Sequence, residues 1–202
     1  MLQKGAIKEL VIYMGTMQSV SFLKPLDIDE IKQAAKDAAG HIDAVYLHWS
    51  AGRYGQVYDS YHLTIDKDGR IYAPDDFLDF TVKRNHTWKR NGRAIGIAVA
   101  AAFDAKANSG LNMDMGSNPV TENQIEAMAM VMAVLNRFAY IPISNMITHC
   151  EAAIEDGYGP FSGDEDTRWD LWYLPDSAED YMLRPGGAVL RGKARWYVDN
   201  MK

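Results

Sequence analysis

The stretch "AIGIAVAAA", residues 94–102, contains neither a charged nor a hydrogen-bonding side chain. An uninterrupted apolar run of this kind is typical of a central strand that is buried on both faces of a sheet. Such a strand is stable only when other elements cover the sheet above and below. The run therefore predicts a sheet in the middle of the molecule with helices packed against it.

Two segments have the pattern of helices. They are residues 27–40, "DIDEIKQAAKDAAG", and residues 121–140, "TENQIEAMAMVMAVLNRFAY". Each opens with a capping box, in which the side chains of the first and fourth residues satisfy free backbone N–H groups. The two boxes are formed by Asp27 with Glu30 and by Thr121 with Gln124.

Three further segments have the pattern of strands: residues 43–49, 60–66 and 143–151. The second of them alternates around Tyr61, Leu63 and Ile65, and it is followed by an Asp68-Gly69 turn into a short return strand. Strands and helices alternate loosely along the chain, which predicts an α/β fold.

Charge and composition exclude several classes of function. The net charge is -6 and there is no long basic run, so we expect no nucleic-acid partner. The one cysteine, Cys150, allows no internal disulfide. The apolar stretch "LVIYM" near the N-terminus is too short for a signal-peptide core or a membrane span. We expect a monomeric single domain over residues 1–202, made in the cytoplasm without a signal peptide and binding no membrane.

Two histidines suggest a metal site. His48 and His149 each end a predicted strand, and neighbouring strands would bring them to the same edge of the sheet. A catalytic zinc ion takes three protein ligands and leaves one position open for water, and Asp170 in "TRWDLW" is a possible third ligand. The alternative is that each histidine is a partly buried residue whose hydrogen bonds are satisfied within the fold.

Five sequence motifs occur in the order found in one known family. "YLHWSAG" resembles the first-ligand motif of the type 2 zinc-dependent N-acetylmuramoyl-L-alanine amidases, which include phage lysozymes and peptidoglycan recognition proteins. "SYHLTIDKDGRIY", "RNHTWKRNGRAIGIAV" and "VTENQIEAMAMVMAVLNRFAYIPISNMITHCE" are similar to the segments that follow in that family. The resemblance covers residues 43–174. Residues 1–42 would be an N-terminal strand and helix segment, and residues 175–202 a C-terminal extension.

The resemblance implies a fold, a cofactor and a ligand set. The fold would be a central mixed β-sheet flanked by helices, and the cofactor Zn²⁺. His48 and His149 match the two histidine ligands, and Asp170 matches the third. Because the loop before Asp170 is longer than usual in the family, a third ligand from the neighbouring acidic residues stays open as an alternative: Asp164, Glu165 or Asp166.

The resemblance also implies two catalytic residues. Tyr61 matches a tyrosine that lines the site in phage-lysozyme members, and Arg168 stands where many active members have lysine. Arginine keeps the positive charge but essentially cannot donate a proton. In the central strand, relatives often have a glutamate where this chain has Ala98, or Ala100 if the register is shifted.

Five residues are candidates for binding a long polar substrate. Aromatic rings can stack on sugar faces, and a cation can meet the carboxylates of a stem peptide; core packing or a solvated surface charge is the alternative for each. The five are Trp49, Arg53, His86, Trp88 and Trp169. In the C-terminal extension, basic residues with Trp196 and Tyr197 would form either a wall-contacting patch or a closing element with a solvated face.

These features imply a zinc-dependent hydrolase of peptidoglycan that cuts between the muramoyl lactyl group and L-alanine. A phage or prophage endolysin that reaches the cell wall after its release fits best. A cytoplasmic amidase that recycles muropeptides is the first alternative. A module that binds peptidoglycan without cutting it is the second, although such modules usually lack a zinc ligand that is present here.

Overall fold

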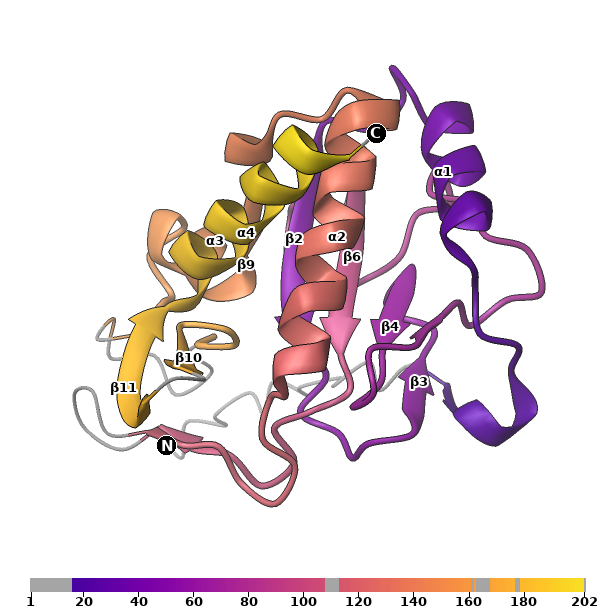
Figure 1. Cartoon of the computed structure of the whole chain (residues 1–202). Coiled ribbons are helices and arrows are strands. Elements are labelled where there is room, and N and C mark those ends of the chain that lie inside the picture. Colours follow the sequence, from indigo (N-terminus) through magenta and orange to yellow (C-terminus); the bar gives the residue numbers. More distant parts are fainter. Residues whose placement is uncertain (1–15, 108–112, 161, 163–167, 177–178, 202) are drawn as a thin grey trace, which may run out of the picture.

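The computed structural model describes residues 16–107, 113–160, 162, 168–176 and 179–201. Its centre is a five-stranded sheet with four parallel strands and one antiparallel edge strand (Figure 1). In spatial order the strands are β5 (Ile71–Tyr72), β4 (Leu63–Ile65), β6 (Ala94–Val99), β2 (Ala44–Trp49) and β9 (Met146–Thr148). The predicted mixed sheet is confirmed.

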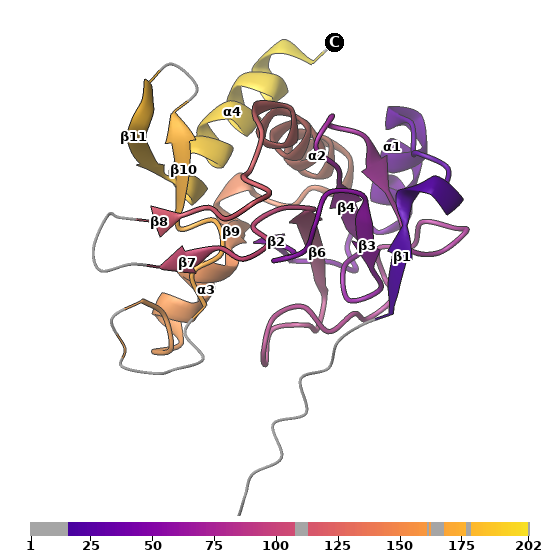
Figure 2. The same cartoon turned by 90° about the horizontal axis from the view of Figure 1, so that it is seen from below.

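Helices cover this sheet unequally on its two sides. The helices are α1 (Ile28–Asp37), α2 (Glu122–Ala139), α3 (His149–Glu155) and α4 (Gly186–Asn200). Figure 2 shows α1, α2 and α4 along one side of the sheet and α3 on the other. The capping boxes predicted for α1 and α2 are both present, so the sequence located these two helix starts correctly.

Short paired strands surround the main sheet. β1 (Met17–Ser19) pairs with β3 (Gln56–Tyr58), β7 (Lys106–Ala107) with β8 (Met113–Asp114), and β10 (Tyr173–Asp176) with β11 (Glu179–Pro185). Two 3₁₀ helices, η1 (Val20–Phe22) and η2 (Ile143–Asn145), complete the elements. The turn between β4 and β5 has Gly69 in the left-handed region at φ +83°, as the Asp68-Gly69 pair predicts.

The strand β6 is buried along its whole length, as its composition predicts. On the α2 side, its residues Ile95 and Ile97 belong to the main core together with Met128 and Leu135. On the other side, Ala94 packs in a small cluster with Tyr46 of β2 and Ala152 of α3.

Two predicted strands differ from the observed elements. The segment 143–151 is a strand only over β9, because Thr148 caps a new helix that begins with His149. Thr148 and Glu151 form a capping box, and this T-x-x-E spacing was not among the predicted helix starts. The strand predicted over 60–66 is limited to β4, so that Tyr61 precedes the strand instead of lying in it.

The C-terminal helix α4 packs against α2 and joins the main core through Leu190 and Ala194. Its Arg191 donates two hydrogen bonds to Glu151 in the first turn of α3, at 2.7 and 2.8 Å. In this way α4 supports the start of the helix that carries His149. No helix within the described ranges is both long enough and apolar enough to cross a membrane.

Candidate metal centre

The parallel register of β2 and β9 brings the two histidines together. Leu47 pairs with Thr148, so the next residue on each segment, His48 or His149, lies at the same edge of the sheet. Both side chains are buried. Their ring centroids are 4.7 Å apart, although the two residues come from distant parts of the chain.

Asp170 lies between the two imidazoles. Its Oδ2 is 3.0 Å from His48 Nδ1, and its Oδ1 is 3.2 Å from His149 Nδ1. One ligand atom from each of the three residues lies within 4.8 Å of the other two. Of the alternatives for the third ligand, Asp164, Glu165 and Asp166 lie outside the described residues.

A tight turn holds Asp170 in this position. The N–H of Trp172 donates to the carbonyl of Trp169, and Leu171 between them adopts the left-handed conformation at φ 58°. The side chain of Leu171 is buried in the core. The turn thus directs Asp170 inward immediately before β10.

The electrostatics of the three residues suit a cation. Burial lowers the pKa of His48 to about 4, against the opposing effect of its hydrogen bond with Asp170. Burial by itself would raise the pKa of Asp170, but the interactions with His149 and His48 outweigh burial and hold this pKa below its ordinary value. At neutral pH the site therefore offers an uncharged imidazole at His48 and a carboxylate at Asp170.

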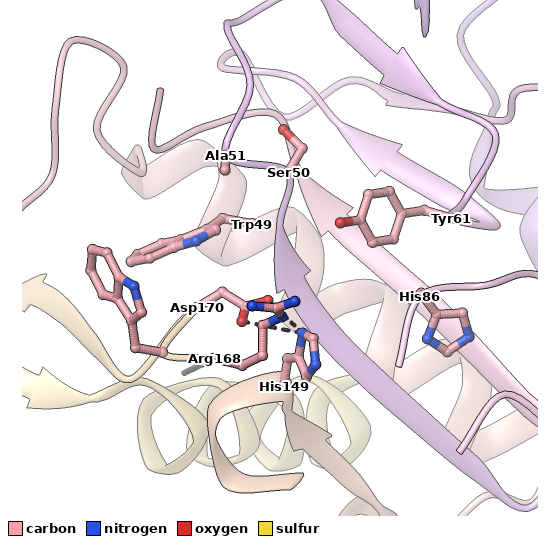
Figure 3. A pocket seen from close by; sticks show the side chains of 9 residues that line it. Trp49, Ser50, Ala51, Tyr61, His86, His149, Arg168 and Asp170 are labelled. Carbon is pink, nitrogen blue, oxygen red and sulfur yellow. Dashed lines mark hydrogen bonds and ion pairs between the residues drawn. The ribbon is translucent and has the colours of Figure 1, made fainter. Parts of the chain in front are cut away.

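This donor set fits a zinc-type cation. Two imidazoles and one carboxylate are the ligand types of catalytic zinc sites, which keep a further position open. Two of the three, His149 and Asp170, line a pocket of about 340 Å³, and His48 lies directly behind them (Figure 3). The lining residues are Trp49, Ser50, Ala51, Tyr61, His86, His149, Arg168, Trp169 and Asp170. A ligand in this pocket would have direct access to His149 and Asp170.

Residues 29–165 match the model of a protein family described as N-acetylmuramoyl-L-alanine amidase, Amidase_2. The match spans more than half of the chain. The chain belongs to this amidase family. The matched range contains His48 and His149 but ends before Arg168 and Asp170, so the positions of these two residues in the site come from the structure itself.

Two solved amidase structures are similar to this chain. One is the N-acetylmuramoyl-L-alanine amidase LysC from Clostridium intestinale URNW, with 18% identity and a TM-score of 0.39; the similarity covers 55% of this chain and 72% of that one. The other is the endolysin N-acetylmuramoyl-L-alanine amidase LysCS from the same organism, with 18% identity and a TM-score of 0.38, covering 55% and 70% of the two chains. A search of curated proteins found no match.

The two residues that we predicted to be catalytic in this amidase both line the pocket. The ring of Tyr61 lies 5.1 Å from the ring of His48, and Figure 3 shows its hydroxyl directed into the pocket. Burial and the nearby Asp170 raise the pKa of Tyr61 above its ordinary value, so the phenol keeps its proton. Arg168 reaches the pocket from the segment that carries Asp170, two residues away.

The five residues predicted to bind substrate fall into two groups. Trp49, Trp169 and His86 line the pocket, and the two indole rings meet edge to face at 4.8 Å. Trp88 and Arg53 are outside the lining. Trp88 is 60% exposed and contacts the ring of Tyr158, whereas the guanidinium of Arg53 lies 3.6 Å from the ring centroid of Phe103.

The central strand supplies no acid to this site. Ala98 pairs in register with His48, and both Ala98 and Ala100 are completely buried. Among the residues that line the pocket, Asp170 is the one carboxylate.

Thr87, which contacts His48 directly, was not among the residues predicted for the site. The signal was present in "NHTWKRN", where a threonine next to a histidine is followed by an asparagine that can hold a loop.

Proposed function

We propose that this amidase is zinc-dependent and that it hydrolyses the amide bond between the muramoyl lactyl group and L-alanine of peptidoglycan. The observation that carries the proposal is the convergence of His48, His149 and Asp170, the last two of which line a pocket, in a chain of the amidase family. Two imidazoles and one carboxylate would hold a divalent cation without burying a large uncompensated charge.

Zinc bound there would supply a Lewis acid for the scissile carbonyl and would lower the pKa of a bound water to about 7. The protein side chains would do the rest. The raised pKa of Tyr61 keeps its phenol protonated, so this residue would donate a hydrogen bond to the scissile group or to the attacking water. Arg168 would stabilise the negative charge that develops on the carbonyl oxygen, since a guanidinium stays protonated throughout.

The substrate would extend beyond the pocket. Trp49 and Trp169 would contact the part of the substrate next to the scissile bond. Trp88 is exposed outside the pocket lining, so its ring would contact a long polymer that extends beyond the pocket. A small muropeptide would depend less on this contact. The exposed ring therefore supports an endolysin-like role on the intact wall over a role in recycling. The test is a comparison of cleavage rates: faster cleavage of soluble muropeptides than of whole sacculi would favour recycling.

One experiment tests the proposed reaction. Purified protein is incubated with peptidoglycan, with and without a chelator, and the products are identified by mass spectrometry. We expect free L-alanine amino termini that disappear with the chelator and return when zinc is added. Retention of uncut wall material on the protein, independent of metal, would instead indicate a binding module.

A pair of histidine variants tests the site itself. His149→Ala should abolish both zinc stoichiometry and cleavage. The matched control is His41→Ala, because His41 is exposed and follows Gly40 after the end of α1. A metallated and active His149→Ala variant would remove this residue from the site.

A further inference from the structure

A hydroxyl group lies on the far side of His48 from Asp170. Thr87 Oγ1 is 3.3 Å from His48 Nε2 and 3.0 Å from His86 Nδ1. All three side chains are buried, so water cannot easily replace these contacts. A continuous line of polar groups therefore runs from Asp170 through His48 and Thr87 to His86.

The loop that carries Thr87 is held at several points. Asn91 Oδ1 accepts hydrogen bonds from the backbone N–H groups of His86 and Thr87, at 3.1 and 2.7 Å. The N–H of Arg90 donates to the carbonyl of Thr87 at 3.1 Å, and the guanidinium of Arg90 donates to Asp156 at 2.6 and 2.7 Å. Asp156 is the C-cap of α3, the helix that begins with the second histidine.

The position of His86 is fixed by its packing against β6. Its imidazole packs directly on the backbone of β6 at Gly96, where a Cβ atom would overlap the ring. Only glycine leaves room for the ring at this point. Thr87 thus lies between two buried imidazoles whose positions are fixed by the surrounding fold.

We propose that Thr87 is a positioning residue for His48, and that it selects the tautomer with the proton on Nε2. The proposal rests on the proposed metal site. His48 Nδ1 lies 3.0 Å from Asp170 Oδ2, and a carboxylate can only accept, so this nitrogen carries the proton when no cation is bound and must be bare when it binds one. The proton of the neutral ring then lies on Nε2 and is donated to Thr87 Oγ1. Toward His86 Nδ1, 3.0 Å away, the same hydroxyl can either donate its proton or accept a second hydrogen bond.

The chemistry requires a hydroxyl at this place. A threonine hydroxyl both accepts and donates, whereas a valine of the same shape does neither. With valine, a proton on Nε2 of His48 would be buried without an acceptor, which is costly. The ring would then favour the tautomer with the proton on Nδ1, where Asp170 can accept it, and this tautomer cannot bind a metal through Nδ1.

Zinc affinity tests the proposal. The dissociation constant is measured by competition with a chromogenic chelator for the full chain and for Thr87→Val, Thr87→Ser and Thr64→Val. We expect Thr87→Val to bind zinc about 10–100-fold more weakly, the usual effect of losing a partner of a metal ligand. Thr87→Ser keeps the hydroxyl and should restore binding.

Thr64→Val is the matched control. Thr64 is completely buried on β4, and its Oγ1 has no hydrogen-bond partner, so the same substitution removes no contact there. Unchanged affinity in Thr87→Val, or equal weakening in both valine variants, would overturn the role of Thr87. Failure of the unmodified chain to bind zinc would contradict the proposed function itself, a result distinguishable from either of these.

The tautomer can be read without any variant. Long-range ¹H–¹⁵N spectra of the zinc-loaded protein should place the proton of His48 on Nε2. A proton on Nδ1 would overturn the proposal even if Thr87→Val fails to fold.

Discussion

His48 and His149 lie with their rings 4.7 Å apart because two parallel strands are in register, not because the residues are close in sequence. The backbone pairing of β2 with β9 is formed by residues that play no part in the chemistry. It follows that the geometry of the site depends on the sheet and on the elements that hold Asp170 and α3 against it.

The identity of the third ligand is open to a direct test. Asp170→Asn keeps the shape of the side chain but removes its charge, so we expect it to lose zinc stoichiometry, measured by metal analysis after dialysis. The combined variant Asp164→Asn, Glu165→Gln and Asp166→Asn should keep one zinc per chain. Loss of zinc in the combined variant, with retention in Asp170→Asn, would transfer the ligand role to that acidic segment.

The proposed role of Arg168 predicts that its loss lowers kcat but leaves zinc binding unchanged. Arg168→Ala should lower kcat by about 100-fold or more, the range seen when a donor to a developing oxyanion is removed. Zinc stoichiometry should not change, because Arg168 is not in the ligand set. Arg168→Lys keeps the positive charge and should recover part of the activity. A variant that loses zinc together with activity would assign Arg168 a structural role.

The contact between α4 and α3 predicts an effect on stability. Arg191→Met removes both hydrogen bonds to Glu151, which also caps the first turn of α3. We expect the free energy of unfolding to fall by about 1–3 kcal/mol, since hydrogen bonds to a charged group and a helix cap are each of this order. Urea denaturation measures the change. Arg195→Met, at an exposed position of the same helix, is the control and should have little effect.

The buried His62 predicts a dependence of stability on pH. Its Nε2–H donates to the carbonyl of Val82 at 2.7 Å, and its Nδ1 accepts the N–H of Gly96 at 3.0 Å. Burial, opposed by the hydrogen bond to the Val82 carbonyl, lowers the pKa of His62 to about 4. Between pH 6.5 and 4 the unfolded chain binds the proton and the folded chain does not, so acid favours unfolding.

The contribution of His62 to the free energy of unfolding should therefore be fully present above pH 6.5 and should be lost as the pH decreases toward 4. One such group contributes at most about 1.4 kcal/mol per pH unit, and His48 adds to the effect in the same direction. Urea denaturation at several pH values, in the presence of a chelator, should give a smaller slope for His62→Gln than for the unmodified chain. An equal slope in the variant would show that His62 does not remain neutral.

Some of the fold could be predicted because the signals are local. The capping boxes of α1 and α2, the apolar run of β6 and the Asp68-Gly69 turn each depend on residues within one or two turns of chain. The capping box of α3 was equally local, at Thr148 and Glu151, but the apolar residues before it suggested a strand that continues through His149.

The sequence by itself determined the helices α1 and α2, the central strands β2 and β6 and, through its motifs, that His48, His149 and Asp170 are candidate ligands in an amidase fold. Only the tertiary structure decided that Asp170 lies between them, that α4 supports α3 through Arg191, and that Thr87 reaches His48. The physical reason is the range of the interactions. Caps and hydrophobic patterns act between near neighbours, whereas strand register and the packing of loops join residues whose separation along the chain carries no information about their distance in space.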